Sequence, residues 1–358
     1  MAFSTVTSIS QAAELPDWLH FPDTDENMST ISPEEAGVDL TKWEAYLAAQ
    51  SARGEGYGGT HHREGEWGAV IVRGGYLLHT WGNPDFQYQT ASLGKCFTRI
   101  VLTLAVDEEL IGSENDLVRF HWTGEELLNS PHKYLDRGYH NTLTFAHLKN
   151  MRGGFPVSDA YSWNRRIEDM AGGVPEWAKW TGDADYDNYA HAEPGKYRKY
   201  SSGGYWRLSQ ALTAIWGRDI KHVLDEKIMG RIGIRADEWA WIPGRDVHDN
   251  SYPGYDFYPD RPGYGLYLDP PYHVDDHLVR GGPGWVVMSA RQLARVGLLI
   301  ATGGWWKGER LISEIYGFNS VMGGTWGEGP PSCSAWGVVC TKGIEYPPGN
   351  LFTGPIHR

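Results

Sequence analysis

Residues 88–95 read YQTASLGK, and residues 96–105, which follow directly, read CFTRIVLTLA. Apolar side chains recur in the second stretch at i, i+1, i+4, i+5, i+8 and i+9, which predicts a helix with a wide apolar stripe that ends near Gly112. Ser92 falls in the first turn of this helix, and Lys95 follows three positions later on the same face. The sequence therefore predicts a hydroxyl and an amine side by side at the start of a packed helix.

This pair can supply a nucleophile and its base. The first turn of a helix carries unpaired backbone N–H groups and the positive end of the helix dipole. Burial lowers the pKa of a lysine, and a neutral amine can remove the proton that makes serine a weak nucleophile. The spacing alone favours another interpretation, an N-cap serine followed by a surface lysine. Ser130 and Lys133 repeat the spacing in a polar segment without an apolar helix behind it, so we set them aside.

Strand patterns lie near the two ends of the chain, and helix patterns lie in the middle. Residues 67–81 predict a β-hairpin that turns at Arg73-Gly74-Gly75. Helical spacing or capping patterns occur at residues 32–35, 39–51, 143–148, 203–216, 219–234 and 289–300. Residues 250–284 are rich in aromatic residues, glycine and proline without a regular period, which predicts a long ordered loop. Together these patterns predict an α+β fold, in which an antiparallel sheet flanked by helices is built from both chain ends around a helical insertion lobe.

Charge and cysteine content exclude several functions. The 358 residues carry 32 basic and 45 acidic side chains, and the net charge of 32 − 45 = −13 excludes a basic nucleic-acid interface or strong attraction to anionic membranes. The three cysteines, Cys96, Cys333 and Cys340, make neither a disulfide framework nor a Cys-x-x-C motif. We find no signal-peptide pattern and no apolar run of membrane-spanning length, so we expect a cytoplasmic protein.

Clusters of acidic residues and histidines give only weak metal candidates. Residues 183–187 have aspartates at alternate positions, as at the start of a calcium loop, but Asn188 stands where that loop needs glycine. The histidines at residues 61–62 and within 273–277 lack a flanking helix that would fix the spacing of ligands. We expect no metal and no cofactor.

Five segments resemble, in the same order, motifs of the serine β-lactamase and penicillin-binding-protein superfamily. They are the hairpin at 68–82, YQTASLGK at 88–95, LTFAHL and the glycines after it at 143–154, PGKYRKYSSGGY at 194–205, and GGPGW leading into SARQLAR at 281–295. Each is weak alone, but together they are specific and cover about residues 65–300. The subgroup that looks most similar comprises class C β-lactamases and the related family VIII carboxylesterases and peptidases.

The resemblance implies a β-lactamase/transpeptidase-like fold and a division of the chain. Residues 1–35 would form an irregular N-terminal lead-in, and residues 36–358 one domain. Within that domain, an α/β lobe would comprise about residues 36–112 and 285–358, and a helical lobe about residues 113–284.

The resemblance also implies roles for individual residues. Ser92 would be the acylated nucleophile, Lys95 its base, and Tyr200 the hydroxyl that passes the proton to the leaving group. A phenol beside a lysine ammonium can have a lowered pKa, which suits this relay. Without its flanking motif, Tyr200 would read as a core tyrosine. Ser202 stands where the family has asparagine; it can bind substrate by hydrogen bonds, with a shorter reach.

Two stretches near the end of the sequence are candidates for the family's third motif, which lines the substrate site. One begins at Trp336 and the other contains Thr353 and Gly354. If the second is the match, Pro355 follows it and has no N–H for an oxyanion hole. The family continues with further strands and a helix, so we expect a truncated or divergent end at Arg358.

We therefore expect a serine hydrolase that acts on an ester or a small amide through a Ser-Lys-Tyr acyl-enzyme. Its partner would be a small-molecule substrate, neither nucleic acid nor membrane, and its oligomeric state stays open. The aromatic loop at 250–284 would form the rim of the site and favour apolar acyl groups. Two alternatives remain: an acyl transferase that uses the same site, and a catalytically impaired binding protein of the same fold.

Overall fold

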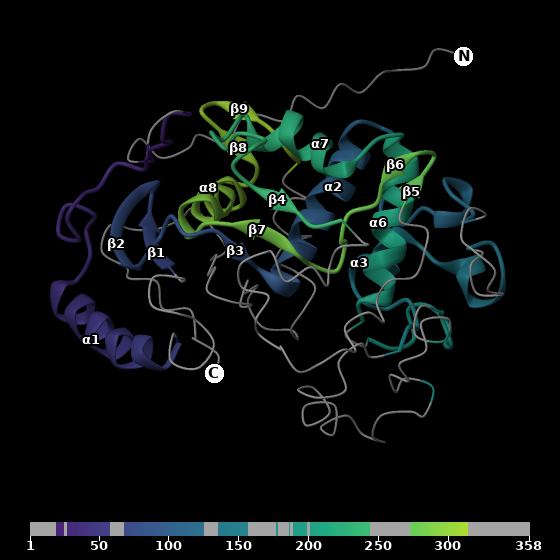
Figure 1. The fold of residues 1–358 in the computed structure, drawn as a ribbon, viewed down its shortest axis with the longest axis horizontal. Coiled ribbons are helices and arrows are strands. Elements are labelled where there is room, and N and C mark those ends of the chain that lie inside the picture. Colours follow the sequence, from purple (N-terminus) through teal and green to yellow (C-terminus); the bar gives the residue numbers. More distant parts are fainter. Residues whose placement is uncertain are drawn as a thin grey trace, which may run out of the picture.

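The computed structural model describes residues 19–24, 27–57, 68–124, 135–156, 177, 186, 189–198, 201–243 and 273–313. In Figure 1, α1 and the hairpin β1–β2 lie at one side, helices α2, α3 and α6 lie at the other, and strands β3, β7 and β4 lie between them. The helical elements are α1 (Leu40–Tyr57), η1 (Ala91–Gly94), α2 (Lys95–Asp107), η2 (Val118–Phe120), η3 (Gly138–Thr142), α3 (Phe145–Lys149), α6 (Gly203–Trp216), α7 (Ile220–Leu224), η5 (Asp225–Met229) and α8 (Ala290–Ala301). The strands are β1 (Gly68–Arg73), β2 (Tyr76–Gly82), β3 (Tyr88–Gln89), β4 (Ala240–Trp241), β5 (His273–Val274), β6 (His277–Leu278), β7 (Val286–Met288), β8 (Trp305–Trp306) and β9 (Glu309–Arg310).

The predicted hairpin is confirmed as β1 paired antiparallel with β2. Its turn residues Gly74 and Gly75 have φ values of 58° and 85°, a region that glycine enters without a steric penalty. A side chain at Gly75 would also collide with the backbone carbonyl of His20. Helix α8 packs against β1, and α1 packs through Trp43 on the Leu78 side chain of β2.

A three-stranded antiparallel sheet joins segments that are far apart in the sequence. Its order is β3-β7-β4, and Val287 of the central strand is paired with both Gln89 and Ala240. The pairing of β3 with β7 brings an early and a late part of the chain together. This agrees with the predicted α+β class, whereas the strands expected within residues 314–358 lie outside the described part of the chain.

Helices α2 and α6 form the centre of the buried helical layer. The predicted apolar stripe of α2 is buried, with Phe97, Ile100, Val101 and Leu104 at most 2% exposed. Helix α6 packs against both α2 and α3, and ends where Gly217 takes a left-handed conformation at φ 57°. No helix among the described residues is long and apolar enough to cross a membrane.

The two predicted capping pairs both form their hydrogen bonds, but only one of them begins a helix. The Ser289 side chain accepts a hydrogen bond from the Gln292 N–H at 3.3 Å, and the Gln292 side chain accepts one from the Ser289 N–H at 2.9 Å, so α8 begins as predicted. Ser32 and Glu35 form the same reciprocal bonds, but there the prediction of a helix start was wrong. The chain makes only a turn at residues 33–37, and Gly37 leaves it at φ 67° before α1 begins.

Three other predicted elements differ from the structure. Helix α2 ends at Asp107 rather than near Gly112, because Glu109 adopts a left-handed φ of 57°. The single helix predicted at 219–234 is instead the short α7 followed by the π-helical turn η5, in which the Gly230 N–H bonds to the carbonyl five residues back. Within the predicted loop at 250–284, strands β5 and β6 form a small hairpin, because Asp275 and Asp276 supply the two left-handed turn residues.

Candidate active site

Ser92 lies in the short turn η1 that precedes the long helix. This turn is fixed to the sheet, because both the backbone N–H and the hydroxyl of Thr90 donate to the Val286 carbonyl of β7 at 2.8 Å. The Leu93 N–H then closes the turn on the Thr90 carbonyl at 3.2 Å. The half-buried Ser92 side chain is thereby held at the junction of the sheet and α2.

Lys95 begins α2 and reaches back to the serine. Its Nζ lies 3.1 Å from Ser92 Oγ and 2.6 Å from the carbonyl oxygen of Pro283. The lysine is only 5% exposed. The structure thus brings together the hydroxyl and amine predicted from their spacing, and it adds a backbone acceptor that the spacing does not reveal.

Burial changes the acid–base chemistry of this lysine. The pKa of Lys95 falls from its ordinary 10.5 to about 7, chiefly because burial disfavours the charged form and further because of the nearby positive charge of Arg99. Close to half of the lysine is therefore neutral near pH 7. A neutral amine at this distance can accept the proton of Ser92, which is the task of a general base.

Arg99 and Tyr205 are two buried residues beside Lys95 that sequence reasoning missed. Arg99 Nε donates to the Tyr205 hydroxyl at 2.5 Å, and its Nη2 donates to the Lys149 carbonyl at 2.9 Å. The Tyr205 hydroxyl donates to that same carbonyl at 2.8 Å. The sequence indicates this buried cluster only through Arg99 itself, a charged residue within the apolar stripe one helical turn after Lys95.

Close glycine contacts hold the turn and α2 against the loop that carries Pro283. A Cβ on Gly94 would lie 2.5 Å from the carbonyl carbon of Gly284. A Cβ on Gly282 would lie 2.4 Å from the backbone oxygen of Tyr205. The backbones can approach this closely because Gly94, Gly282 and Gly284 carry no side chain.

The other predicted site residues are divided between described and undescribed parts of the chain. Ser202 is buried and immediately precedes α6, where its carbonyl accepts a hydrogen bond from the Trp206 N–H at 3.0 Å. Tyr200, Trp336, Thr353 and Gly354 lie outside the described residues.

The weak candidates have no geometry of a metal site or a reactive thiol where they are described. The described residues contain no group of three His, Cys, Asp or Glu side chains placed to hold a metal. Burial raises the pKa of the Cys96 thiol, which disfavours the reactive thiolate form. The aspartates at 183, 185 and 187, the histidines at 61–62, Cys333 and Cys340 lie outside the described residues.

Solved structures of other proteins are similar to this chain. The octameric penicillin-binding protein homologue from Pyrococcus abyssi has 17% sequence identity and a TM-score of 0.44, and the match covers 78% of this chain and 59% of that one. A family VIII carboxylesterase has 17% identity and a TM-score of 0.41, with 66% of this chain and 61% of that one covered. The beta-lactamase/D-alanine carboxypeptidase from Yersinia pestis has 14% identity and a TM-score of 0.38, with 65% of this chain and 62% of that one covered. This chain therefore spans about three fifths of the length of these proteins. A search of the curated proteins finds no match.

The assignment rests on the family model, which matches over a much longer range than any single motif. The beta-lactamase model covers residues 47–316 of the 358, and that range includes the hairpin, the Ser92 turn and the Pro283 loop. The chain belongs to the beta-lactamase family, with its β-lactamase/transpeptidase-like α+β fold.

Proposed function

We propose that this protein is a serine hydrolase that cleaves an ester or a small amide through an acyl-enzyme on Ser92. The observation that carries the proposal is the 3.1 Å separation of Lys95 Nζ and Ser92 Oγ, with the lysine buried and its pKa lowered to about 7. An exposed lysine with an ordinary pKa would be protonated at neutral pH and would not serve as a base.

The proposed first half-reaction acylates the serine. Neutral Lys95 takes the hydroxyl proton as Ser92 Oγ forms a bond to the substrate carbonyl carbon, and the carbonyl π electrons move onto its oxygen. The carbonyl then re-forms, the bond to the leaving alcohol or amine breaks, and the leaving group departs with one proton. We assign to Tyr200 the transfer of this proton from Lys95 to the leaving group, on the strength of the motif around it, so that Lys95 becomes neutral again.

The second half-reaction releases the acyl group. A water molecule gives a proton to neutral Lys95 as its oxygen bonds to the acyl carbon. The bond between that carbon and Ser92 Oγ then breaks as Lys95 returns the proton to the serine. The product is a carboxylic acid. Replacing the water by another alcohol gives acyl transfer on the same residues, and the described side chains favour neither acceptor.

A binding protein of the same fold is the second candidate. The observation that favours it is Ser202, whose side chain is shorter than the asparagine that the family places there. In that case Ser92 and Lys95 would keep their contact, but the protein would bind its ligand without cleaving it.

A fluorophosphonate probe followed by intact-mass measurement separates these candidates. We expect one adduct on the wild type and none on Ser92→Ala. The matched control is Ser130→Ala, which removes the serine of the other Ser-x-x-Lys match and should leave the adduct unchanged. Absence of any adduct on folded wild type would favour the binding protein, and an adduct that persists in Ser92→Ala would mean that another residue is the nucleophile. Ester turnover with and without an added alcohol then measures hydrolysis against transfer.

A further inference from the structure

The loop at residues 280–284 has every backbone carbonyl occupied by a side-chain donor. Ser209 Oγ donates to the Arg280 carbonyl at 2.7 Å, Trp241 Nε1 to the Gly281 and Gly284 carbonyls at 3.0 and 3.1 Å, Thr98 Oγ1 to the Gly282 carbonyl at 2.7 Å, and Lys95 Nζ to the Pro283 carbonyl at 2.6 Å. The donors come from α2, α6 and β4. A loop of irregular backbone is thus held from three sides, so its carbonyls have fixed positions.

The loop is also buried, and its side-chain donors are buried with it. Residues 281–284 are buried, and Thr98, Ser209 and Trp241 are each fully buried. The Gly281 N–H bonds to the Ile242 carbonyl at 2.9 Å, which connects the loop directly to the chain after β4. Movement of this loop would leave several polar groups unpaired in the interior, at a cost of about 1–3 kcal/mol for each.

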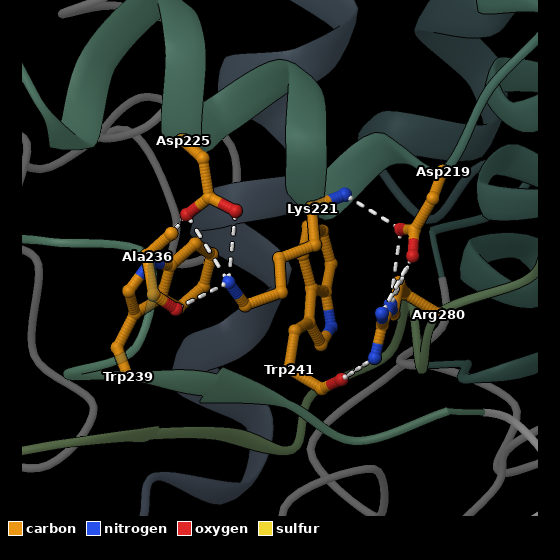
Figure 2. A network of polar contacts seen from close by, with 7 residues as sticks. All are labelled: Asp219, Lys221, Asp225, Ala236, Trp239, Trp241 and Arg280. Carbon is orange, nitrogen blue, oxygen red and sulfur yellow. Dashed lines mark hydrogen bonds and ion pairs between the residues drawn. The ribbon is translucent and has the colours of Figure 1, made fainter.

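An ion pair holds the start of the loop (Figure 2). Arg280 Nε lies 3.0 Å from both carboxylate oxygens of Asp219, and its Nη2 lies 2.5 Å from one of them. Arg280 Nη1 also donates to the Trp241 carbonyl at 2.6 Å. The Asp219 side chain is itself held, because it accepts the Lys221 N–H at the start of α7 at 2.9 Å. Both charged side chains are largely buried, at 14% and 10% exposure.

We propose that the Asp219–Arg280 pair positions Lys95 for its reaction with Ser92, by fixing the loop whose Pro283 carbonyl binds the lysine nitrogen. The inference rests on the proposed function and adds two positioning residues to it. Neither of them contacts Ser92 or the substrate in this scheme, and both act through the loop.

The geometry of a neutral amine explains why a carbonyl is useful here. A neutral lysine nitrogen has two N–H bonds and one lone pair. The Pro283 carbonyl can only accept, so it takes one N–H and limits rotation about the last side-chain bond. The lone pair then remains available for the Ser92 hydroxyl, 3.1 Å away. Loss of the carbonyl would let the nitrogen rotate and spend less time in the reactive orientation.

Other groups near Lys95 lie outside the loop and the ion pair. Among them are Arg99 and Cys96 on the same helix, α2, and the Tyr205 ring on α6, whose centroid lies 5.5 Å from the lysine nitrogen. None of them contacts Asp219 or Arg280 through a described hydrogen bond. A change at Arg280 that alters the titration of Lys95 would therefore act through the loop.

The test compares Arg280→Met with Arg280→Lys and with a matched control from the same network. Lys221→Met is the control, because Lys221 Nζ pairs with Asp225 at 2.9 Å and with the Ala236 carbonyl at 3.0 Å and does not touch the loop (Figure 2). Arg280→Met and Lys221→Met each leave one largely buried aspartate without its cation, so their losses of stability should be similar. Asp219→Asn is a milder variant in case Arg280→Met does not fold.

Two measurements are made on each folded variant. The first is the rate of fluorophosphonate labelling of Ser92, which should fall about tenfold or more in Arg280→Met and recover in part in Arg280→Lys. The second is titration of Lys95 by the carbon-13 shift of its Cε in lysine-labelled protein, assigned with Lys95→Met. The ammonium loses an acceptor in Arg280→Met, so the pKa of Lys95 should fall further. Lys221→Met should match the wild type in both measurements.

The outcomes separate this inference from the proposed function. Wild type that is not labelled at Ser92 contradicts the proposed function, while the titration still tests the contact between the loop and Lys95. Labelled wild type whose rate and Lys95 titration are unchanged in Arg280→Met, or in Asp219→Asn if that is the folded variant, contradicts the inference. Equal effects in Lys221→Met would also overturn it, because they would assign the change to general destabilisation.

Discussion

Arg99 follows Lys95 by one turn of α2, and the two cations share the ring of Tyr205. The ring centroid lies 5.5 Å from Lys95 Nζ and 5.9 Å from Arg99 Cζ. Arg99 is 2% exposed, and its contacts with the Tyr205 hydroxyl and the Lys149 carbonyl prevent it from turning away. A fixed, buried positive charge is thus placed where it favours the neutral form of the lysine.

Replacing Arg99 by methionine should raise the pKa of Lys95, because a like charge that disfavours its protonated form is removed. Less of the lysine is then neutral at pH 7, so fluorophosphonate labelling at that pH should slow by roughly two- to fivefold. Labelling should recover as the pH rises. A pH–rate profile with an unchanged or lower midpoint would show that Arg99 does not tune the lysine.

Lys95→Met should change how stability depends on pH. The unfolded chain holds the lysine proton up to about pH 10.5, but the folded chain releases it near pH 7, so the free energy of unfolding of the wild type rises with pH between these values. The variant lacks this cost and should be more stable than wild type near pH 7, by on the order of a few kcal/mol, with the difference shrinking toward pH 10.

Urea unfolding at pH 6.5 and 9.5 measures that difference. Lys42→Met is the control, because the Lys42 side chain is 71% exposed and its removal should have no such pH dependence. A stability difference between Lys95→Met and wild type that stays constant with pH would contradict the burial of a neutral lysine. The same variant should lose labelling of Ser92 by about a hundredfold or more.

Gly94→Ala should disturb the turn that carries Ser92. The added Cβ would meet the backbone of Gly284 at 2.5 Å, and backbone atoms held by other bonds cannot give way easily. We expect a loss of about 1–3 kcal/mol in the free energy of unfolding, together with slower labelling of Ser92.

Gly230→Ala is the comparison for that variant. Its Cβ would meet only the Asp225 carbonyl oxygen, at 3.2 Å, and its φ of −60° suits any residue. Thermal unfolding and labelling of both variants should show the loss in Gly94→Ala alone. Normal labelling of Gly94→Ala would mean that the turn and the loop do not need their close approach.

Tyr205→Phe should destabilise the protein by about 1–3 kcal/mol, because Arg99 Nε and the Lys149 carbonyl each lose a buried partner. The ring that packs beside Lys95 is retained, so labelling of Ser92 should fall much less than in Lys95→Met. Urea unfolding measures the loss, with Tyr139→Phe at an exposed position as the control. A Tyr205→Phe protein as stable as wild type would show that the hydroxyl is dispensable to Arg99.

Local patterns in the sequence predicted the turns and helix starts that depend on neighbouring residues. Two adjacent glycines predicted the β1–β2 turn, and the Ser289–Gln292 pair predicted the start of α8. The contact of Lys95 with Ser92 followed only from the spacing together with the motifs around it. Periodicity failed where one residue changes the backbone, as at Glu109 and in the Asp275–Asp276 turn, since aspartate and glutamate give no clear signal for a left-handed conformation.

The remainder of the site depends on contacts between distant residues. Nothing near Pro283 in the sequence indicates that its carbonyl binds a lysine 188 positions earlier. Similarly, Asp219 lies at the start of a segment that the sequence predicts as helical, and nothing local indicates its pairing with Arg280, 61 positions later. Such contacts follow from how the helices pack on the sheet, which periodicity alone does not determine.

The separation of Lys95 from Pro283 has a consequence during synthesis on the ribosome. The serine and the lysine emerge with the start of α2. The Pro283 carbonyl is made 188 residues after Lys95, and Val286 of the strand that holds the Ser92 turn is made 196 residues after Thr90. At 5–20 residues per second, that interval is about 10–40 s. Helix α6, which packs on α2, is made within this period, so the helical layer can form first. The Ser92 turn and the Lys95 amine receive their last contacts only when the loop and strand β7 have been made.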